Sequence, residues 1–346
     1  MKATKVRHLY LAQSPLQILN AFEARERDGD GVEHDLILLE KENAYHNRLV
    51  ENTLRFLKWQ PLHRLPCRTS TLGKLWNWMV LRHWISRLQP VARVHVGEYA
   101  LGMMVAAANL CTGAEFHLVD DGTSSLSFSD FRYRGVRDAR YPAKGANRLL
   151  KFDPELPPAL TFFSIYDLEI HPPDRLERNR LGFVRRSIEF DDAGPVLFVG
   201  SNLPDNEEMS YPRFFELMRG IRAHFGSRPI RYYAHRTEHM HLKESVFAEL
   251  RIEIVLGELP FEMSMLQGGQ KPSFVAGFYS TVLDTLRLSG VAPDGRLISF
   301  HVASEEIRTP IEKVMAATCY ANYGRSPGMV VVRDYTPTAG AGLPIP

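Results

Sequence analysis

Short apolar runs alternate with longer amphipathic stretches along most of the chain. An apolar run bounded by polar or turn residues predicts a buried strand, and an amphipathic stretch predicts a helix. We expect strands over residues 8–12, 34–40, 93–97, 116–119, 195–199, 229–236, 252–255 and 274–279. We expect helices over residues 15–22, 47–59, 73–88, 100–110, 211–225 and 282–288. Alternation of strands and helices is typical of an open parallel sheet, so the pattern predicts an α/β fold.

The alternation breaks between residues 130 and 190, where the chain is basic, rich in proline and weakly patterned. A new apolar run begins just after Asp191-Asp192-Ala193-Gly194. Weak patterning followed by a turn-rich stretch is typical of a domain boundary. We therefore expect an irregular segment over 130–190 and two domains, residues 1–190 and 191–346.

Composition excludes several classes of protein. The 346 residues carry 42 Lys and Arg against 40 Asp and Glu, so the net charge of +2 does not indicate a nucleic-acid-binding protein. Cys67, Cys111 and Cys319 are far apart and form no CxxC pair, which argues against a disulfide framework or a cysteine zinc site. The sequence shows no signal peptide and no apolar run of about 18 residues that could span a bilayer. A cytoplasmic protein is expected.

The strand over 116–119 ends in Asp120-Asp121-Gly122. The carboxyl ends of parallel strands form the edge at which α/β proteins bind ligands. Adjacent like charges raise the pKa of one carboxyl group, which suits a general base, and Gly122 allows a sharp turn. The alternative is an Asx turn with no chemical role. Neighbouring strand residues point to opposite faces, so we expect one acid to act and favour Asp120.

Polar residues also follow the expected strands over 8–12 and 195–199. Gln13 and Ser14 follow the first strand, and Ser14 should cap a helix that begins at Pro15, which leaves backbone N–H groups over the strand end. Gly200 follows the strand over 195–199, where a glycine commonly lets the loop backbone approach a ligand, with Ser201 and Asn202 next.

Two further strand ends carry groups suited to an anion. His235 and Arg236 end the strand over 229–236. Ser280 and Thr281 precede the helix over 282–288, and Thr281 with Asp284 approximates a capping box. Hydroxyl groups and helix N–H groups can together hold an anion. The alternatives are a histidine bonded to a carbonyl group and an ordinary helix cap.

Two motifs of nucleotide-binding proteins are absent from the sequence, which argues against those classes of protein. Neither GxGxxG nor GxxxxGK[ST] occurs at the expected turns, which weakens dinucleotide-dehydrogenase and P-loop interpretations. No second run of Asp, Glu or His at ligand spacing accompanies Asp120 and Asp121, so we expect no metal there.

Four short motifs occur in a fixed order: Tyr10–Gln17 (YLAQSPLQ), Asp120–Gly122 (DDG), Tyr232–Arg236 (YYAHR) and Phe278–Thr281 (FYST). Over about residues 8–290 this order resembles bacterial GT-B sialyltransferases and polysialyltransferases. Their hallmarks are D/E-D/E-G, His-Pro and Ser-Ser/Ser-Thr motifs. The chain departs from the family in one place, because Arg236 follows His235 where the family has proline.

The resemblance implies the GT-B architecture, with two Rossmann-like domains facing a central cleft. It also implies an inverting, metal-independent transfer of sialic acid, or a related nonulosonic or ulosonic acid, from a CMP-activated donor to a bacterial surface glycan such as capsule or lipopolysaccharide. Kdo, pseudaminic acid and legionaminic acid remain open as the sugar. The alternative is a non-catalytic nucleotide-sugar-binding or polysaccharide-assembly protein. The first domain would bind a glycan or glycolipid acceptor and the second the CMP-sugar, with no cofactor.

The resemblance also assigns roles to residues. Asp120 or Asp121 would be the base that deprotonates the acceptor. His235 would contact the phosphate of the CMP leaving group, as a donor or as its acid. The remaining assignments are Ser280, Thr281, Gly200, Ser201, Asn202 and Arg236 on the donor side, and Gln13, Ser14, Gly122 and Glu262 on the acceptor side or elsewhere in the cleft.

The expected helix over 73–88 holds three of the four tryptophans, Trp76, Trp78 and Trp84, together with Lys74, Arg82 and Arg87. Basic residues among large aromatic residues suit a helix at a membrane surface or in a partner's groove. The alternative is a core-facing helix with solvated charges. The first possibility predicts peripheral contact between residues 73–88 and the inner-membrane surface.

Overall fold

The computed structural model describes residues 6–29, 31–68, 70–135, 151–186, 188–267, 271–326 and 328–335. The chain divides into two compact units, which are described separately. The first comprises Met1–Phe183 with Glu258–Pro260, and the second comprises Val184–Gly257 with Phe261–Pro346. The division at 183–184 lies a few residues before the predicted boundary at 190–191.

The described strands of the first unit form one parallel sheet with the order β3-β2-β1-β4-β5-β6-β7. Their bounds are β1 (Val6–Ala12), β2 (Val32–Glu40), β3 (Leu62–Pro66), β4 (Arg93–Val96), β5 (Glu115–Val119), β6 (Thr161–Ser164) and β7 (Arg175–Arg178). The central strands are almost continuously buried, because a parallel sheet is covered on both faces.

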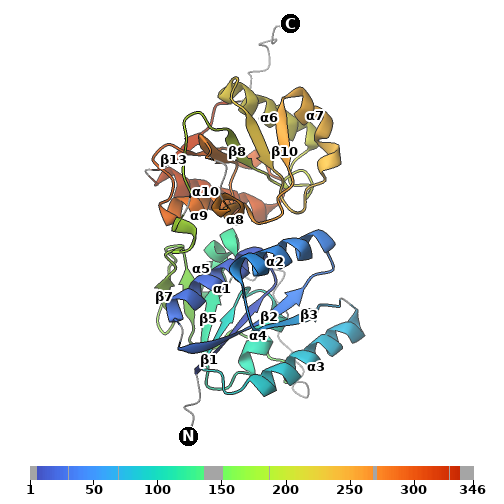
Figure 1. Cartoon of the computed structure of the whole chain (residues 1–346), viewed down its shortest axis with the longest axis vertical. Coiled ribbons are helices and arrows are strands. Elements are labelled where there is room, and N and C mark those ends of the chain that lie inside the picture. The colour runs from blue at the N-terminus through green and yellow to red at the C-terminus, as the bar shows by residue number, and fades with distance from the viewer. Residues whose placement is uncertain are drawn as a thin grey trace. The chain divides into compact units, whose positions relative to one another are not determined.

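Helices cover both faces of this sheet. The described helices are α1 (Pro15–Asp28), α2 (Ala44–Leu57), α3 (Thr71–Leu88), α4 (Gly102–Asn109), the 3-10 helix η1 (Gly122–Ser127) and α5 (Phe128–Tyr133). Figure 1 shows α1 and α2 on one face and α3 and α4 on the other. Ser14 caps α1 as predicted, because its Oγ accepts the N–H of Gln17 at 3.3 Å and Pro15 begins the helix.

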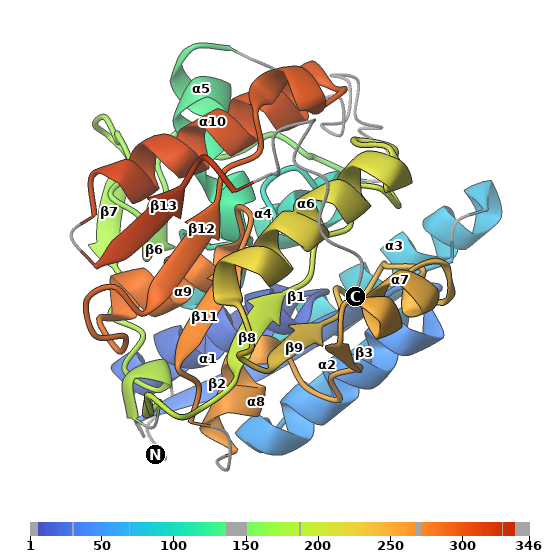
Figure 2. The same ribbon diagram turned by 90° about the horizontal axis from the view of Figure 1, so that it is seen from above.

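The second unit repeats this organisation. Its described strands form a parallel sheet with the order β10-β9-β8-β11-β12-β13, and Figure 2 shows β9, β8, β11, β12 and β13 side by side. The strands are β8 (Val196–Val199), β9 (Ile230–Tyr233), β10 (Ile252–Val255), β11 (Phe274–Gly277), β12 (Leu297–Phe300) and β13 (Met329–Val332).

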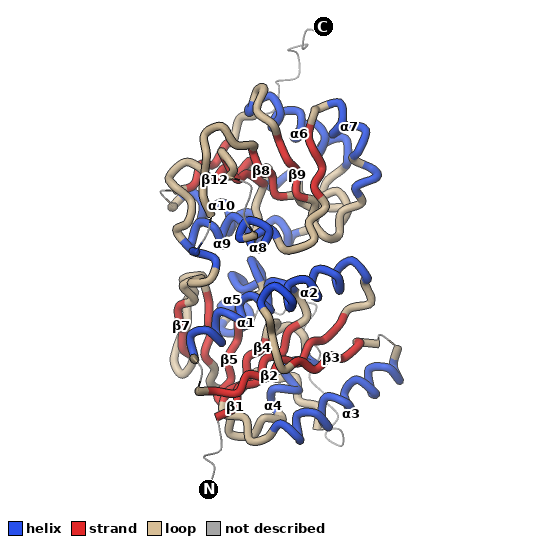
Figure 3. The backbone as a smooth tube through the Cα atoms, in the orientation of Figure 1, coloured by secondary structure: helices blue, strands red, loops and turns tan. Residues whose placement is uncertain are grey.

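The main helices of the second unit are α6 (Tyr211–Phe225), α7 (Glu244–Glu249), α8 (Phe261–Leu266), α9 (Thr281–Ser289) and α10 (Pro310–Gly324). Three short 3-10 helices, η3 (Val184–Arg186), η4 (Met240–Leu242) and η5 (Ser304–Glu306), complete it. Figure 3 shows α6 and α7 on one side of the sheet and α8 and α9 on the other.

In each sheet the strand order reverses direction at one point, between β1 and β4 and between β8 and β11. Both orders are of the Rossmann type, in which ligands bind beyond the carboxyl ends of the strands at the reversal point. The loops after β1, β4 and β5 in the first unit and after β8, β9 and β11 in the second are therefore the candidate binding loops.

The predicted α/β alternation is confirmed, but the expectation of an irregular segment over 130–190 is wrong. Strands β6 and β7 lie in that segment, whereas its residues 136–150 are outside the described residues. Strand β6 has only two apolar residues, and the edge strand β7 carries Arg175, Glu177 and Arg178, so neither forms an apolar run. Strands β3, β12 and β13 were not predicted either. No described helix has the length and apolarity needed to cross a bilayer.

Candidate functional site

Asp120 is a buried link between two strand ends. Its side chain is 1% exposed. Its Oδ1 accepts the hydroxyl hydrogen of Ser164 at 2.7 Å, and its Oδ2 accepts the N–H of Ile165 at 2.6 Å. Burial raises the pKa of Asp120 to about 7. Because both oxygens accept hydrogen bonds from the end of β6 and the residue after it, the preference for Asp120 as the base does not fit its position.

Asp121 is the accessible acid of the pair. The residue is partly exposed, and its Oδ1 accepts a hydrogen bond from Gln17 Nε2 at 2.9 Å. Its N–H donates to Ser125 Oγ at 3.1 Å, which holds the start of η1. Gly122 has a φ of 68°, so it takes the left-handed conformation that the sharp turn requires. The turn leaves Asp121 at the carboxyl edge of the sheet, where a substrate hydroxyl could reach it.

A buried amide orients Asp121. Gln17 lies in the first turn of α1, and its Oε1 accepts the N–H of Gln13 at 2.8 Å. That bond leaves the Nε2 of Gln17 facing Asp121. A Cβ atom at Gly97 would lie 2.7 Å from Gln17 Oε1, so glycine after β4 makes room for the amide. The Gln13 side chain in turn donates to Glu98.

The structure thus joins Gln13, Ser14 and Gly122 to Asp121 through the ends of β1, β4 and β5. The roles of Gln17, Gly97 and Glu98 were not predicted. A signal was present for Gln17, a polar residue among the apolar residues of a first helical turn, and for Gly97, a glycine directly after a strand.

Glu262 does not belong to this group. It lies in α8 of the second unit, whereas Gln13, Ser14 and Gly122 lie in the first. Its carboxyl group is buried, and burial raises its pKa. Its assignment to a cleft therefore stays a prediction, separate from the acceptor-side residues of the first unit.

His235 follows β9 in the second unit and is held as a neutral donor. Thr237 donates its N–H to His235 Nδ1 at 3.4 Å, and Thr237 Oγ1 lies 2.9 Å from the same nitrogen. Acceptance of the Thr237 N–H by Nδ1 favours the neutral tautomer that carries its ring proton on Nε2. Burial lowers the pKa of His235 to about 4, and the cations of Arg236 and Lys243 add to this effect. A role as donor fits this environment, and a role as acid does not.

A buried ion cluster fixes the loop that carries His235. Lys243 is fully buried, and its Nζ donates to Asp205 Oδ2 at 2.7 Å and to Glu238. Glu238 also accepts the Tyr232 hydroxyl at 2.6 Å and the N–H of His235. Buried charges are stable only when paired and hydrogen-bonded, as these are. The contacts of Asp205 and Lys243 with this loop were not predicted.

Gly200 packs against the loop after β9 that carries His235. A Cβ atom at Gly200 would lie 2.6 Å from the Tyr233 carbonyl oxygen and 2.8 Å from the His235 nitrogen. Glycine therefore accommodates the loop after β9, which differs from the predicted close approach of a ligand. The next residues join the loop too, because the Ser201 N–H donates to the Tyr232 hydroxyl at 3.1 Å and Asn202 Nδ2 donates to Thr237 Oγ1 at 2.9 Å. Arg236 is partly exposed in this loop.

Ser280 begins α9 at the carboxyl end of β11. Its Oγ accepts the N–H of Val282 at 3.2 Å, which leaves the hydroxyl hydrogen to donate, and Thr281 is the first helical residue. Its backbone is fixed by Tyr323, whose hydroxyl accepts the Ser280 N–H and donates to the Ser280 carbonyl, both at 3.1 Å. The hydroxyl groups and the helix N-terminus can hold an anion.

The prediction of a capping box formed by Thr281 and Asp284 is wrong. The helix is capped by Ser280, one residue earlier than predicted, and Asp284 is buried against the core. Its carboxylate pairs with Arg287 at 2.8 Å.

Among the described residues, no group of metal-ligating side chains includes Asp120 or Asp121.

Comparison with known proteins identifies the fold. No protein-family model and no curated protein matches this sequence. The Staphylococcus aureus MnaA–UDP structure has a TM-score of 0.52 at 13% identity, covering 86% of this chain and 79% of that one. The Methanocaldococcus jannaschii UDP-GlcNAc 2-epimerase with UDP-GlcNAc and UDP gives 0.51 at 14%, covering 95% and 89%. TcCGT1 in complex with UDP gives 0.50 at 12%, covering 95% and 86%. The chain has the GT-B fold, built of two Rossmann-like domains.

We expect His235 to stay neutral at pH 7, with its proton on Nε2. Nitrogen-detected NMR of the imidazoles, assigned by comparison with His235→Gln, should show this tautomer and a midpoint near pH 4. The unfolded histidine binds a proton near its ordinary pKa of about 6.5, whereas the folded one does not until about pH 4. Stability should therefore fall as pH drops through this interval, and less steeply in His235→Gln. A midpoint near 6.5 would contradict the burial argument.

Proposed function

We propose that the protein is an inverting glycosyltransferase that moves sialic acid, or a related nonulosonic or ulosonic acid, from a CMP-activated donor to a glycan hydroxyl of the bacterial surface. One observation carries the proposal. Asp121, in the DDG motif, is partly exposed at the carboxyl edge of its sheet and is oriented by the buried amide of Gln17. The order of the YLAQSPLQ, DDG, YYAHR and FYST motifs supports the choice of sugar class.

Asp121 acts as the general base on the acceptor. Its carboxylate takes the proton of the acceptor hydroxyl while that oxygen attacks the anomeric carbon of the donor. The bond between this carbon and the CMP phosphate oxygen breaks, and CMP leaves as a phosphate monoester with the electron pair. Displacement from the opposite face inverts the configuration. The hydrogen bond from Gln17 holds the carboxylate in the orientation that this proton transfer needs.

The second domain stabilises the leaving group. Negative charge develops on the phosphate as the bond breaks, and preorganised donors lower the energy of that state. His235 offers its Nε2–H as a neutral donor, and Ser280 and Thr281 offer hydroxyl groups at the start of α9. Ser201, Asn202 and Arg236 lie in the loops beside His235 and complete the donor side.

No metal or other cofactor is required by this chemistry, since neutral donors and a helix N-terminus supply the charge stabilisation. Transfer in excess EDTA should therefore proceed at the rate seen without chelator. Complete loss of turnover that magnesium or manganese restores would instead assign Asp121 to a metal site.

Substitution of the two acids separates their roles. Asp121→Asn should lower CMP release and transfer by about 100-fold or more, because the base is lost while the fold is kept. Asp120→Asn should mainly lower the midpoint of thermal unfolding, since it breaks the buried link to Ser164 and Ile165. The exposed Asp167→Asn is the matched control. Unchanged turnover in Asp121→Asn would overturn the assignment.

Gln17→Leu should act through Asp121. We expect a lower kcat with little change in KM, and the acidic limb of the pH profile moved to higher pH, because the Asp121 carboxylate loses the hydrogen bond that favours its charged form. Gln17→Glu tests the effect of a negative charge at this position, and Gln17→Asn tests the effect of a shorter side chain. If Gln17 only supports the fold, Gln17→Leu should leave the pH dependence of kcat unchanged, which would contradict this assignment.

The identity of the sugar donor can be tested by measuring transfer from a set of nucleotide-sugars. The solved structures of similar fold named above contain UDP or UDP-GlcNAc, so UDP-sugars are included beside CMP-activated sialic, Kdo, pseudaminic and legionaminic acids. Transfer from a CMP-sugar supports the proposal, and transfer from UDP-sugars alone contradicts it. Binding of a nucleotide-sugar with neither hydrolysis nor transfer would point to the alternative, a binding or assembly protein.

We further propose that the enzyme works at the cytoplasmic face of the inner membrane, held there by α3. Leu72, Leu75, Trp76 and Met79 are 80%, 42%, 57% and 48% exposed, and their spacing places them on one side of the helix. Trp78 is buried and Trp84 half-buried, so only Trp76 of the three α3 indoles is available to lipid. No Asp or Glu occurs over residues 52–97, which leaves Lys74, Arg82 and Arg87 to face an anionic surface.

The protein should co-sediment with anionic liposomes at low ionic strength and not with neutral ones. Changing Lys74, Arg82 and Arg87 to Gln should release it, because each basic group contributes about 1 kcal/mol near such a surface. Leu75→Ser with Trp76→Ser should do the same. Ile311→Ser with Val314→Ser is the matched control, since these α10 side chains are also exposed. Equal sedimentation of all variants would assign α3 to another role.

A further inference from the structure

A row of buried histidines crosses one face of the first sheet. His8 of β1 pairs in register with His34 of β2, and His95 of β4 pairs with Tyr10 of β1 and with His117 of β5. All four imidazoles are buried. None lies in the loops beyond the carboxyl ends of the strands that hold Asp121, so the proposed reaction does not use them.

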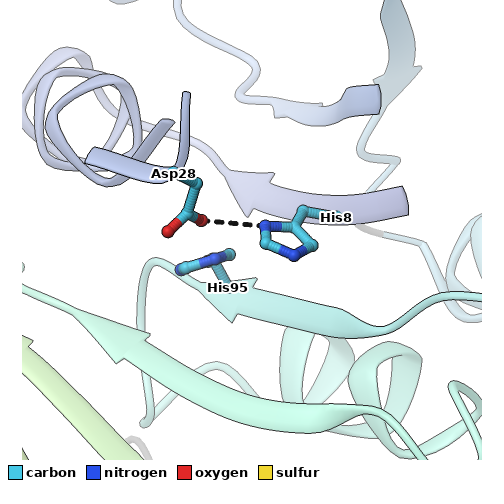
Figure 4. A group of neighbouring side chains, drawn as sticks. All are labelled: His8, Asp28 and His95. Carbon is cyan, nitrogen blue, oxygen red and sulfur yellow. Dashed lines mark hydrogen bonds and ion pairs between the residues drawn. The ribbon is translucent and has the colours of Figure 1, made fainter. Parts of the chain in front are cut away.

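Two of these histidines meet a carboxylate. Asp28 is the last residue of α1, and its Oδ2 lies 2.8 Å from His8 Nδ1. One nitrogen of each of His8 and His95 and one oxygen of Asp28 lie within 4.8 Å of one another. Figure 4 shows the three side chains turned toward a common space between α1, β1 and β4.

His95 is the unusual member of this group. Its side chain is 1% exposed, and neither ring nitrogen has a hydrogen-bond partner. A neutral imidazole has one donor and one acceptor, and leaving a buried polar group unsatisfied costs about 1–3 kcal/mol. The ring of Tyr10 stacks on it at 4.4 Å with an interplanar angle of 7°, which fixes the plane of the imidazole. His34, by contrast, has partners for both nitrogens, Tyr10 and the Gly29 carbonyl.

The side chains around Asp28 include both arginines and further carboxylates. Arg27 and Arg93 both contact Asp28 Oδ1 at 3.1 Å, which leaves Oδ2 directed toward His8. Each arginine also pairs with a second carboxylate, Arg27 with Glu177 and Arg93 with Glu115. These two glutamates, whose side chains are 42% and 65% exposed, partly offset the charge of the guanidinium groups beside Asp28.

We propose that His8, Asp28 and His95 bind one divalent transition-metal ion of the zinc type. Two imidazole nitrogens and one carboxylate oxygen are a donor set that suits zinc, whereas magnesium and calcium prefer oxygen ligands alone. Ligands about 2.1 Å from a tetrahedral zinc lie about 3.4 Å apart, so small side-chain rotations would bring these three together. The hydrogen bond between His8 and Asp28 is then replaced by two metal bonds, and His95 gains a partner.

Such an ion would join β1, β4 and the end of α1. With three protein ligands, the fourth position of the ion would be taken by a water molecule. Binding would stabilise the first unit, separately from the base Asp121. Because metal bound to the folded state raises its stability, zinc should shift unfolding of this unit. All four tryptophans lie in the first unit, so tryptophan fluorescence reports on this unfolding directly.

The test uses the untagged full-length protein, stripped with a chelator and dialysed against zinc chloride alone. We expect one bound zinc per chain by elemental analysis, a higher midpoint of tryptophan-detected unfolding, and tetrahedral absorption bands when cobalt replaces zinc. His95→Gln and Asp28→Asn should each weaken zinc binding at least tenfold and abolish the shift. His34→Gln, in the same row but outside the group, should keep both.

Zinc-independent unfolding of the wild-type protein would overturn the proposal, as would undiminished zinc binding in His95→Gln or Asp28→Asn. If His95→Gln does not fold, Asp28→Asn alone decides, because it preserves size at a helix terminus. None of these measurements requires glycosyl transfer, so they stand apart from the proposed function.

Discussion

The buried carboxylate of Asp120 determines how the first candidate site is built. Its two oxygens accept hydrogen bonds from Ser164 and Ile165, and so tie the end of β5 to the end of β6. Because neighbouring residues at a strand end point in opposite directions, burial of Asp120 turns Asp121 toward the carboxyl edge of the sheet. One acid of the pair is structural, and the other is available for chemistry. The site therefore depends on a group that itself contacts no substrate.

In the second domain, too, buried polar groups hold a residue assigned to the reaction, but here they form a cluster of charged side chains. The loop after β9 carries the partly buried His235, and the buried cluster of Asp205, Lys243 and Glu238 fixes the loop by hydrogen bonds. Removing one member would leave a buried charge unpaired, which is far more costly than losing an exposed ion pair. In both domains, buried polar groups that are fully hydrogen-bonded fix the exposed groups to which we assign the reaction.

Much of this arrangement could be predicted from the sequence, and the rest depends on tertiary contacts. The apolar periods located most strands of both sheets, and the cap at Ser14 was predicted from local chemistry alone. Strands β6 and β7 could not be found, because they hold only two and one apolar residues and so show no apolar run. The choice between Asp120 and Asp121 depended on β6, and the position of Glu262 depended on the course of the chain. The group of His8, Asp28 and His95 arises from strand register, which no single segment reveals.

The central claim is that Asp121 performs the proton transfer while the second domain binds the nucleotide. Calorimetric titration of CMP into Asp121→Asn, with sugar transfer measured on the same preparation, tests it most directly. The account predicts a dissociation constant for CMP equal to that of the wild-type protein, together with loss of transfer. Wild-type transfer by this variant, or loss of CMP binding along with transfer, would contradict it.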